Sequence, residues 1–96
     1  MKQIVGFKTT AGADVLGYLE SENDNELVIT QARIVVSQPG QGGDIGIALP
    51  PWTILAIEGS VSVNKIAIAC QFPSIADELA RAYMQATSAL DLSAIS

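Results

Sequence analysis

The apolar residues of this 96-residue chain change their spacing once, at Pro73-Ser74, and this change constrains the fold more than any other feature. Before it, apolar residues form short runs separated by glycine, proline and charged residues, a pattern typical of β-strands. After it, they recur every three or four positions from Ile75 to Leu90, which is the period of a helix. The pattern predicts one mostly β domain with a C-terminal α-helix.

The first half of the β-like part predicts three strands. Residues 3–9 and 15–20 pair through a turn at Gly12, because glycine adopts a positive φ at little cost. Gly17 lies inside the second strand, and a glycine there indicates a sharp bend or a bulge. The third strand covers 27–36, and its length favours a bend across two faces of a sheet.

The second half predicts two more strands. Residues 45–49 alternate in polarity, and 52–57 resume the extended pattern after an interruption at Pro50-Pro51. Residues 61–71 form the last predicted strand, and the glycine-rich segment 38–44 is predicted to be a flexible loop. Five short, bent antiparallel strands on so few residues suggest a small, partly closed barrel.

The helix is predicted to begin at Ser74, a natural N-cap, with Asp77 in the capping-box position. It is expected to run to about Ala89 and to fray soon after. We expect segment 73–96 to pack on a barrel formed by residues 1–72, as part of the same domain.

The composition is apolar for so small a domain. Hydrophobic residues make up 49% of the chain and charged residues 16%, which favours apolar surface covered by another copy of the chain. The net charge is −5 and no basic run exists, so the electrostatic signature of duplex-DNA binding is missing.

The sequence predicts no catalytic residue, metal site or cofactor, and therefore no enzyme. There is no histidine to form a nucleophile–base pair, and the single cysteine, Cys70, is predicted to be a buried structural thiol. The acids Glu20, Glu22, Asp24 and Glu26 are predicted to be solvated. Without a secretory or membrane-spanning segment, the chain is expected to be cytoplasmic.

Trp52 has two interpretations. It follows two prolines and precedes a predicted strand, so its ring could stack on a base of a single-stranded nucleic acid. A tryptophan also commonly lies in the core or in a subunit contact. The sequence favours the second interpretation.

The motifs of the first half resemble the first signature of the Sm-like family. They are a turn glycine at Gly12, the Gly17-Tyr18-Leu19 strand, and the segment from Asn23 to Ile29. Ile57-Glu58-Gly59 is similar to the step between the last two strands in the second signature. The Pro50-Pro51-Trp52 step and the acidic helix with a tyrosine resemble short Sm-like proteins of marine cyanophages and ocean metagenomes.

This resemblance implies a strongly bent five-stranded antiparallel barrel of the SH3 type. It implies rings of five to seven identical subunits, with a pentamer or hexamer favoured, and the host cytoplasm as the location of a phage-encoded protein. Single-stranded RNA would bind at the loops that face the pore. The resemblance implies that the loop residues Asn23, Asn25, Gly59 and Ser60 contact the RNA. Asn64 and Lys65, which follow the second loop, are expected to contact it as well.

Two functional hypotheses follow. In the first, the ring binds single-stranded nucleic acid, most often RNA, with a role in RNA or DNA processing. In the second, it is a structural or adaptor ring whose partner is another protein. The acidic net charge favours the second, as does Glu58, which stands where the family has a basic residue.

Overall fold

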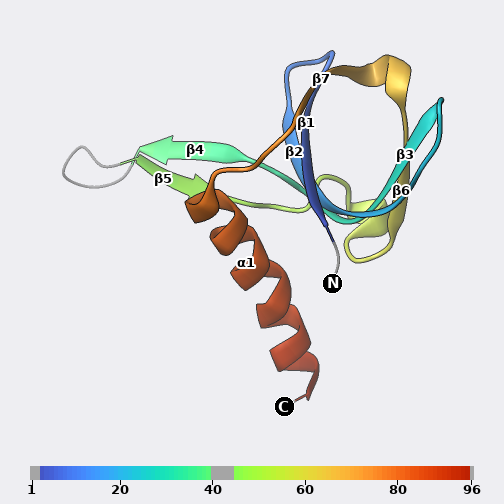
Figure 1. The fold of residues 1–96 in the computed structure, drawn as a ribbon. Helices are drawn as coiled ribbons and strands as arrows, with labels where there is room; N and C mark the ends of the chain where they lie inside the picture. The colour runs from blue at the N-terminus through green and yellow to red at the C-terminus, as the bar shows by residue number, and fades with distance from the viewer. Residues whose placement is uncertain (1–2, 40–44, 96) are drawn as a thin grey trace.

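The computed structural model describes residues 3–39 and 45–95, which form a five-stranded antiparallel sheet, a separate hairpin and one C-terminal helix (Figure 1). The sheet has the order β6-β3-β2-β1-β7. Its strands are β1 (Ile4–Thr9), β2 (Asp14–Glu22), β3 (Glu26–Ile34), β6 (Ser60–Asn64) and β7 (Ile68–Phe72). The other elements are β4 (Val36–Pro39), β5 (Ile45–Ala48), α1 (Asp77–Ile95) and the 3-10 helices η2 (Ile54–Ala56) and η3 (Lys65–Ala67). The predicted mostly β class with a C-terminal helix is confirmed.

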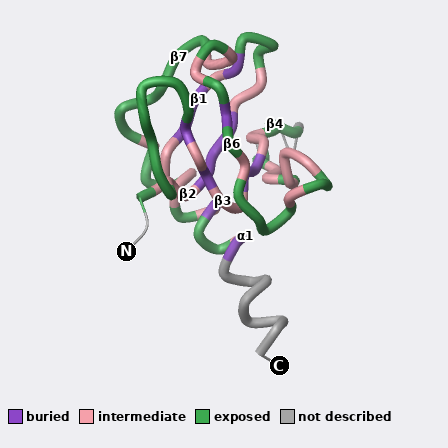
Figure 2. Tube along the Cα trace, turned by 90° about the vertical axis from the view of Figure 1, so that its right-hand side faces the viewer, coloured by how far each residue is buried: buried purple, intermediate pink, exposed green. Residues whose placement is uncertain are grey.

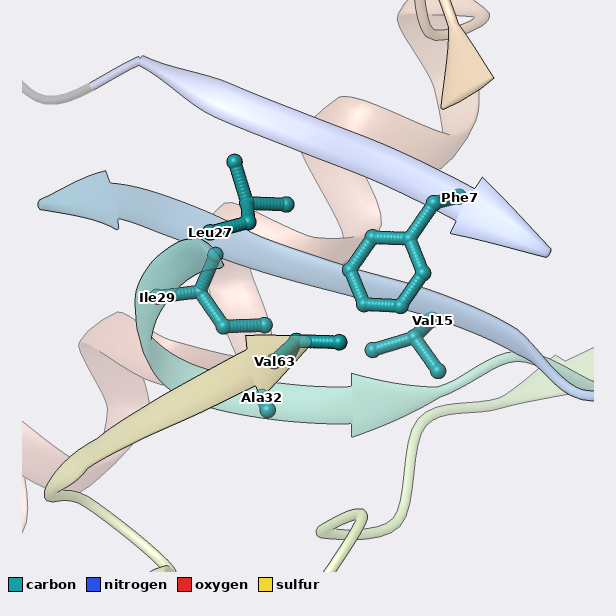
Figure 3. Packing of buried hydrophobic residues seen from close by; sticks show 6 residues of the cluster. All are labelled: Phe7, Val15, Leu27, Ile29, Ala32 and Val63. Atoms are coloured by element: carbon teal, nitrogen blue, oxygen red, sulfur yellow. The ribbon is translucent and has the colours of Figure 1, made fainter. Parts of the chain in front are cut away.

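The sheet curls around one continuous core. In Figure 1, β6 and β7 lie on opposite sides of the curl, and the short η3 segment joins them. The core cluster fills the concave face (Figure 3) and consists of Phe7, Val15, Leu27, Ile29, Ala32 and Val63. Trp52 packs against this cluster, with its ring edge-on to Phe7 at a centroid distance of 6.1 Å.

The predicted bend at Gly17 is confirmed. The pairing of β2 with β3 shifts register between Leu16 and Tyr18, which flank this glycine. A Cβ atom at Gly17 would lie 2.8 Å from Cδ1 of Ile29, so the core side chain occupies the space that any other residue would need. Gln31 supplies a second irregularity in β3 with its positive φ of 52°.

The curled sheet is not closed into a barrel, because it ends at β6 and β7. The predicted fourth strand is also wrong in detail. Residues 45–48 pair only with β4, and residues 54–56 form η2 instead of a strand. Proline lacks the N–H that a central strand needs, so Pro50-Pro51 ends the extended run, and the Thr53 hydroxyl then caps η2 by accepting from Leu55 N–H.

The predicted strand over 61–71 is two strands. Asn64 ends β6, and its side-chain oxygen accepts a hydrogen bond from Ile66 N–H at 3.0 Å, which starts η3. A side chain that bonds the backbone two residues ahead favours a turn over a continuing ladder. Of the predicted loop 38–44, residues 38 and 39 belong to β4 and the rest lie outside the described residues.

Cys70 is exposed, contrary to the prediction of a buried thiol. It lies on the edge strand β7, where the pairing with β1 shifts register between Lys8 and Thr9. Because of this shift, the apolar run 66–70 does not keep one face toward the core, and Ile68, not Cys70, packs against the core cluster.

The helix begins at Asp77, three residues after the predicted cap at Ser74, and runs past Ala89 to Ile95. It contacts the convex face of the sheet through Tyr83, which is fully buried. Figure 2 shows a buried stretch of α1 next to the sheet. The Tyr83 hydroxyl donates to the Gln31 carbonyl at 2.8 Å, and its ring lies 5.0 Å from that of Tyr18. The irregular backbone at Gln31 thus provides an anchor for the helix.

The β4–β5 hairpin extends away from the sheet (Figure 1). At its base it is fixed by Arg33. This side chain is only 8% exposed, and its Nη1 donates to the Leu49 carbonyl at 2.9 Å. Backbone hydrogen bonds from Ile34 to Pro50 and from Trp52 to Ala32 hold the same region. The hairpin therefore leaves the sheet in a defined direction.

Substitution of Gly17 tests the origin of the curl. Gly17→Ala should destabilise the fold by about 1–3 kcal/mol, because the added methyl group overpacks the core against Ile29. Gly46→Ala is the matched control: its nearest neighbour would be the Gln38 carbonyl oxygen at 3.8 Å, so we expect a change within about 0.5 kcal/mol. Urea denaturation measures both, and equal stability of the two variants would contradict the proposed role of Gly17.

The helix anchor predicts alkaline unfolding. Burial, with a smaller contribution from Tyr18, raises the pKa of the Tyr83 phenol above its ordinary value of 10.0. The unfolded chain therefore releases this proton first, so the stabilising effect is complete below pH 10 and is lost as the pH rises further. We expect the ionisation of Tyr83 to lower the free energy of unfolding by up to about 1.4 kcal/mol per pH unit above pH 10. Tyr83→Phe should show a flatter profile in urea titrations from pH 8 to 12, and an unchanged slope would exclude Tyr83 as its source.

Candidate nucleic-acid interface

The tip of the β2–β3 hairpin is shaped by Asn23. Its side-chain oxygen accepts hydrogen bonds from the backbone N–H groups of Asn25 and Glu26, each at 2.8 Å. The backbone N–H of Asn23 donates to the Glu26 carbonyl. This is the local bonding by which asparagine replaces a backbone turn. Asn23 therefore forms the turn, and its side-chain oxygen already accepts two hydrogen bonds within the chain.

The start of η3 lies directly against this tip. Lys65 N–H donates to the Asn25 carbonyl at 2.8 Å, and Glu26 is opposite Asn64 in the pairing of β3 with β6. Four of the six predicted contact residues are thus brought together from two distant parts of the sequence. We call this group the tip cluster: Asn23, Asn25, Asn64 and Lys65.

Gly59 and Ser60 do not join the tip cluster. Ser60 begins β6 and lies opposite Thr30, whereas Asn64 ends the same strand opposite Glu26. The interpretation of Ile57-Glu58-Gly59 as the step between the last two strands is therefore wrong. The last two strands are β6 and β7, and their connection is η3. The turn that Asn64 caps lies within an apolar run that is typical of one continuous strand, so the sequence pattern does not reveal it.

Acidic side chains surround the tip cluster. Lys65 Nζ lies 2.7 Å from a carboxylate oxygen of Glu22, so its positive charge is matched within the chain. The Ser60 hydroxyl donates to Glu20 at 2.5 Å, and the Ser62 hydroxyl donates to Glu26. All the acids of residues 20–26 are exposed, as predicted. The net field at this end of the sheet is negative, which opposes the approach of a phosphate backbone.

The other exposed ion pair lies at the opposite end of β2. Lys8 Nζ is 2.8 Å from Asp14, and the hydrogen bond to this carboxylate, followed by its charge, raises the pKa of Lys8. Lys8 is too distant from the tip cluster to offset its negative field, because Asp14 begins β2 whereas Glu22 ends it.

A cavity of about 200 Å³ opens on the concave side next to the tip cluster. Gln3, Glu22 and Gln71 supply its polar lining, and Leu19 and Leu27 are among its apolar residues. Glu22 belongs to both the cavity and the ion pair with Lys65, so the two features are continuous. No pattern in the sequence indicates this cavity, because it depends on the curl that places β7 across from β2.

Among the residues that the structure describes, no group of three or more histidine, cysteine or acidic side chains could hold a metal ion. Within the same residues, no helix is both long and apolar enough to cross a membrane.

Comparison with known proteins gives no assignment. No protein-family model matches the sequence, and no curated protein matches it. The Sm-like resemblance therefore rests on the sequence motifs alone, and it stays a prediction.

Proposed function

We propose that this chain is a self-assembling module that forms an Sm-like ring and acts as a structural or adaptor ring for a protein partner. The observation that carries the proposal is the pair of open edges: within the described part of the chain, β6 pairs only with β3 and β7 only with β1. An unpaired edge presents backbone donors and acceptors that favour pairing with another strand.

The two edges belong to different strands, so a contact between them is head-to-tail. Contacts of this kind generate closed rings when the rotation between copies closes. The Sm-like resemblance supports closure at five to seven copies, with a pentamer or hexamer favoured. In such a ring, each copy completes the sheet of the next one.

Exposed apolar side chains support the same proposal. Ile54 and Leu55 are 84% and 93% exposed in the single chain. Two adjacent, large apolar side chains this exposed on a small domain are typical of a surface that another chain covers. The acidic end of the sheet favours a basic protein surface over a nucleic acid as the external partner of the ring.

Two adjacent proline substitutions in β7 test the edge pairing. Cys70 lies opposite Lys8 and Gln71 opposite Phe7. Antiparallel pairs alternate between hydrogen-bonded and non-hydrogen-bonded, so only one of these two N–H groups bonds β1 and the other points to the open edge. Of Cys70→Pro and Gln71→Pro, we expect one to unfold and the other to fold but remain monomeric.

Circular dichroism identifies the folded variant, and analytical ultracentrifugation gives the masses. The wild-type chain should sediment at several times its 10.0 kDa mass. A wild-type chain that stays monomeric at about 0.1 mM would overturn the proposal, since useful assembly needs a dissociation constant well below that. Full assembly of the folded proline variant would exclude β7 as the contact.

Binding of single-stranded nucleic acid is a second candidate function, and the tip cluster favours it. The amide nitrogens of Asn23 and Asn64 form no hydrogen bond within the described residues, and Asn25 is exposed beside them. In a ring, one tip cluster from each copy would be repeated around the axis. Amide donors at such a position suit the edges of unpaired bases.

Fluorescence anisotropy with short oligo-U and oligo-A tests this candidate. If Lys65 leaves Glu22 to contact a phosphate, Lys65→Ala should reduce the slope of log affinity against log salt by about 0.7. Lys8→Ala is the matched control, because Lys8 lies at the other end of β2 beside Asp14 and should leave the slope unchanged. The absence of binding even at low salt would exclude this function.

A further inference from the structure

Two uncovered apolar features lie outside the core, one just before β6 and one where β7 leads into α1. The first is the η2 knob, formed by Ile54 and Leu55, whose side chains are almost fully exposed. Its backbone is held by the Thr53 cap, so the two side chains are presented from a fixed turn. In Figure 1 this turn lies beside β6.

The second feature is the α1 pocket, a cavity of about 250 Å³ between the convex face of the sheet and the start of the helix. Its apolar lining includes Leu16, Val35, Phe72, Ile75, Ala76 and Leu79. It is open to solvent on one side and lies beside the end of β7, where the chain turns into α1. Its floor lies over β1 and β2, at Gly6 and Leu16, and the wall that contains Phe72, Ile75 and Leu79 belongs to the segment that leads from the β7 edge into α1.

The order of the elements brings these features together between copies. The knob precedes the first residue of β6, and the pocket wall that contains Phe72, Ile75 and Leu79 begins at the last residue of β7. Every strand pair in the sheet is antiparallel. If β6 of one copy pairs with β7 of the next in the same way, the start of β6 meets the end of β7, and the knob approaches the pocket.

The size of the edge shows that such a contact is needed. Each open edge is a strand of five residues, about 17 Å long at the usual rise per residue. Stable protein interfaces bury about 800 Å² on each partner, which main-chain pairing over so short a strand does not provide. An apolar contact continuous with the edge supplies the missing area.

We propose that the η2 knob of one copy docks in the α1 pocket of the next copy. This inference rests on the proposed self-assembly and names the apolar contact that accompanies the edge pairing. The charges near the pocket do not oppose it, because Asp14 at its margin is paired with Lys8. Leu55 inserts as the anchor, and Ile54 covers the rim.

Sedimentation of surface variants tests the contact. Leu55→Ser should raise the dissociation constant of the assembly at least about tenfold, the factor that corresponds to ~1.4 kcal/mol. Ile66→Ser is the matched control: it removes an equally exposed apolar side chain from η3, and we expect less than about a twofold change. Both positions are exposed, so neither change should affect folding.

Disulfide trapping gives a second measurement that does not depend on weakened assembly. On a Cys70→Ser background, chains with Leu55→Cys are mixed with chains that carry Ala76→Cys, which places a thiol in the pocket. Oxidation of the mixture should give a covalent dimer at dilute concentration, whereas either chain alone should give little.

The outcomes separate the two proposals. A monomeric wild-type chain overturns both of them. Normal assembly of Leu55→Ser, or the absence of a trapped dimer in the mixture, overturns the docking of the knob while the edge pairing stands. Equal weakening by Leu55→Ser and Ile66→Ser would point to unspecific apolar association and would also overturn it.

Discussion

The contact between Ile29 and the bare backbone of Gly17 sets the curvature of the sheet, and the other features depend on that curvature. Because no side chain stands at position 17, β3 approaches β2 closely enough for Ile29 to enter the core beside Phe7 and Val15. The curl then carries β6 and β7 to opposite sides of the concave face. Both open edges, and the separation between the η2 knob and the α1 pocket, follow from it.

Local signals in the sequence were sufficient for the first three strands, but they did not indicate β4, which takes Val36 from the end of the predicted third strand. Alternating apolar residues placed the first three strands, and Gly17 marked the bend, because these patterns act over a few residues. The second half depends on competition between local capping and strand pairing. Asn64 and Thr53 each bond the backbone two residues ahead and start a 3-10 turn within a run of apolar residues that is typical of a strand.

The candidate site was predictable only in part, for a related reason. Asn23 and Asn25 stand in a polar segment between two strands, so their location at a tip could be read directly. Their contact with Asn64 and Lys65 depends on the register of β3 with β6, which sequence spacing does not reveal. Residues 61–71 have the apolar pattern of one strand, and this pattern misplaces the step at Gly59. The burial predicted for Cys70 is wrong because the register of β7 shifts against β1.

The pairing of β1 with β7 also governs when the domain can form. Gly6 lies opposite Phe72, so the strand made first at the ribosome has one neighbour that is among the last parts of the sheet to be synthesised. Contacts of such high sequence separation slow folding, because a long loop must close before they form. The nascent chain therefore cannot complete its sheet until β7 has left the exit tunnel, and until then one side of β1 stays open to neighbouring nascent chains on the same messenger.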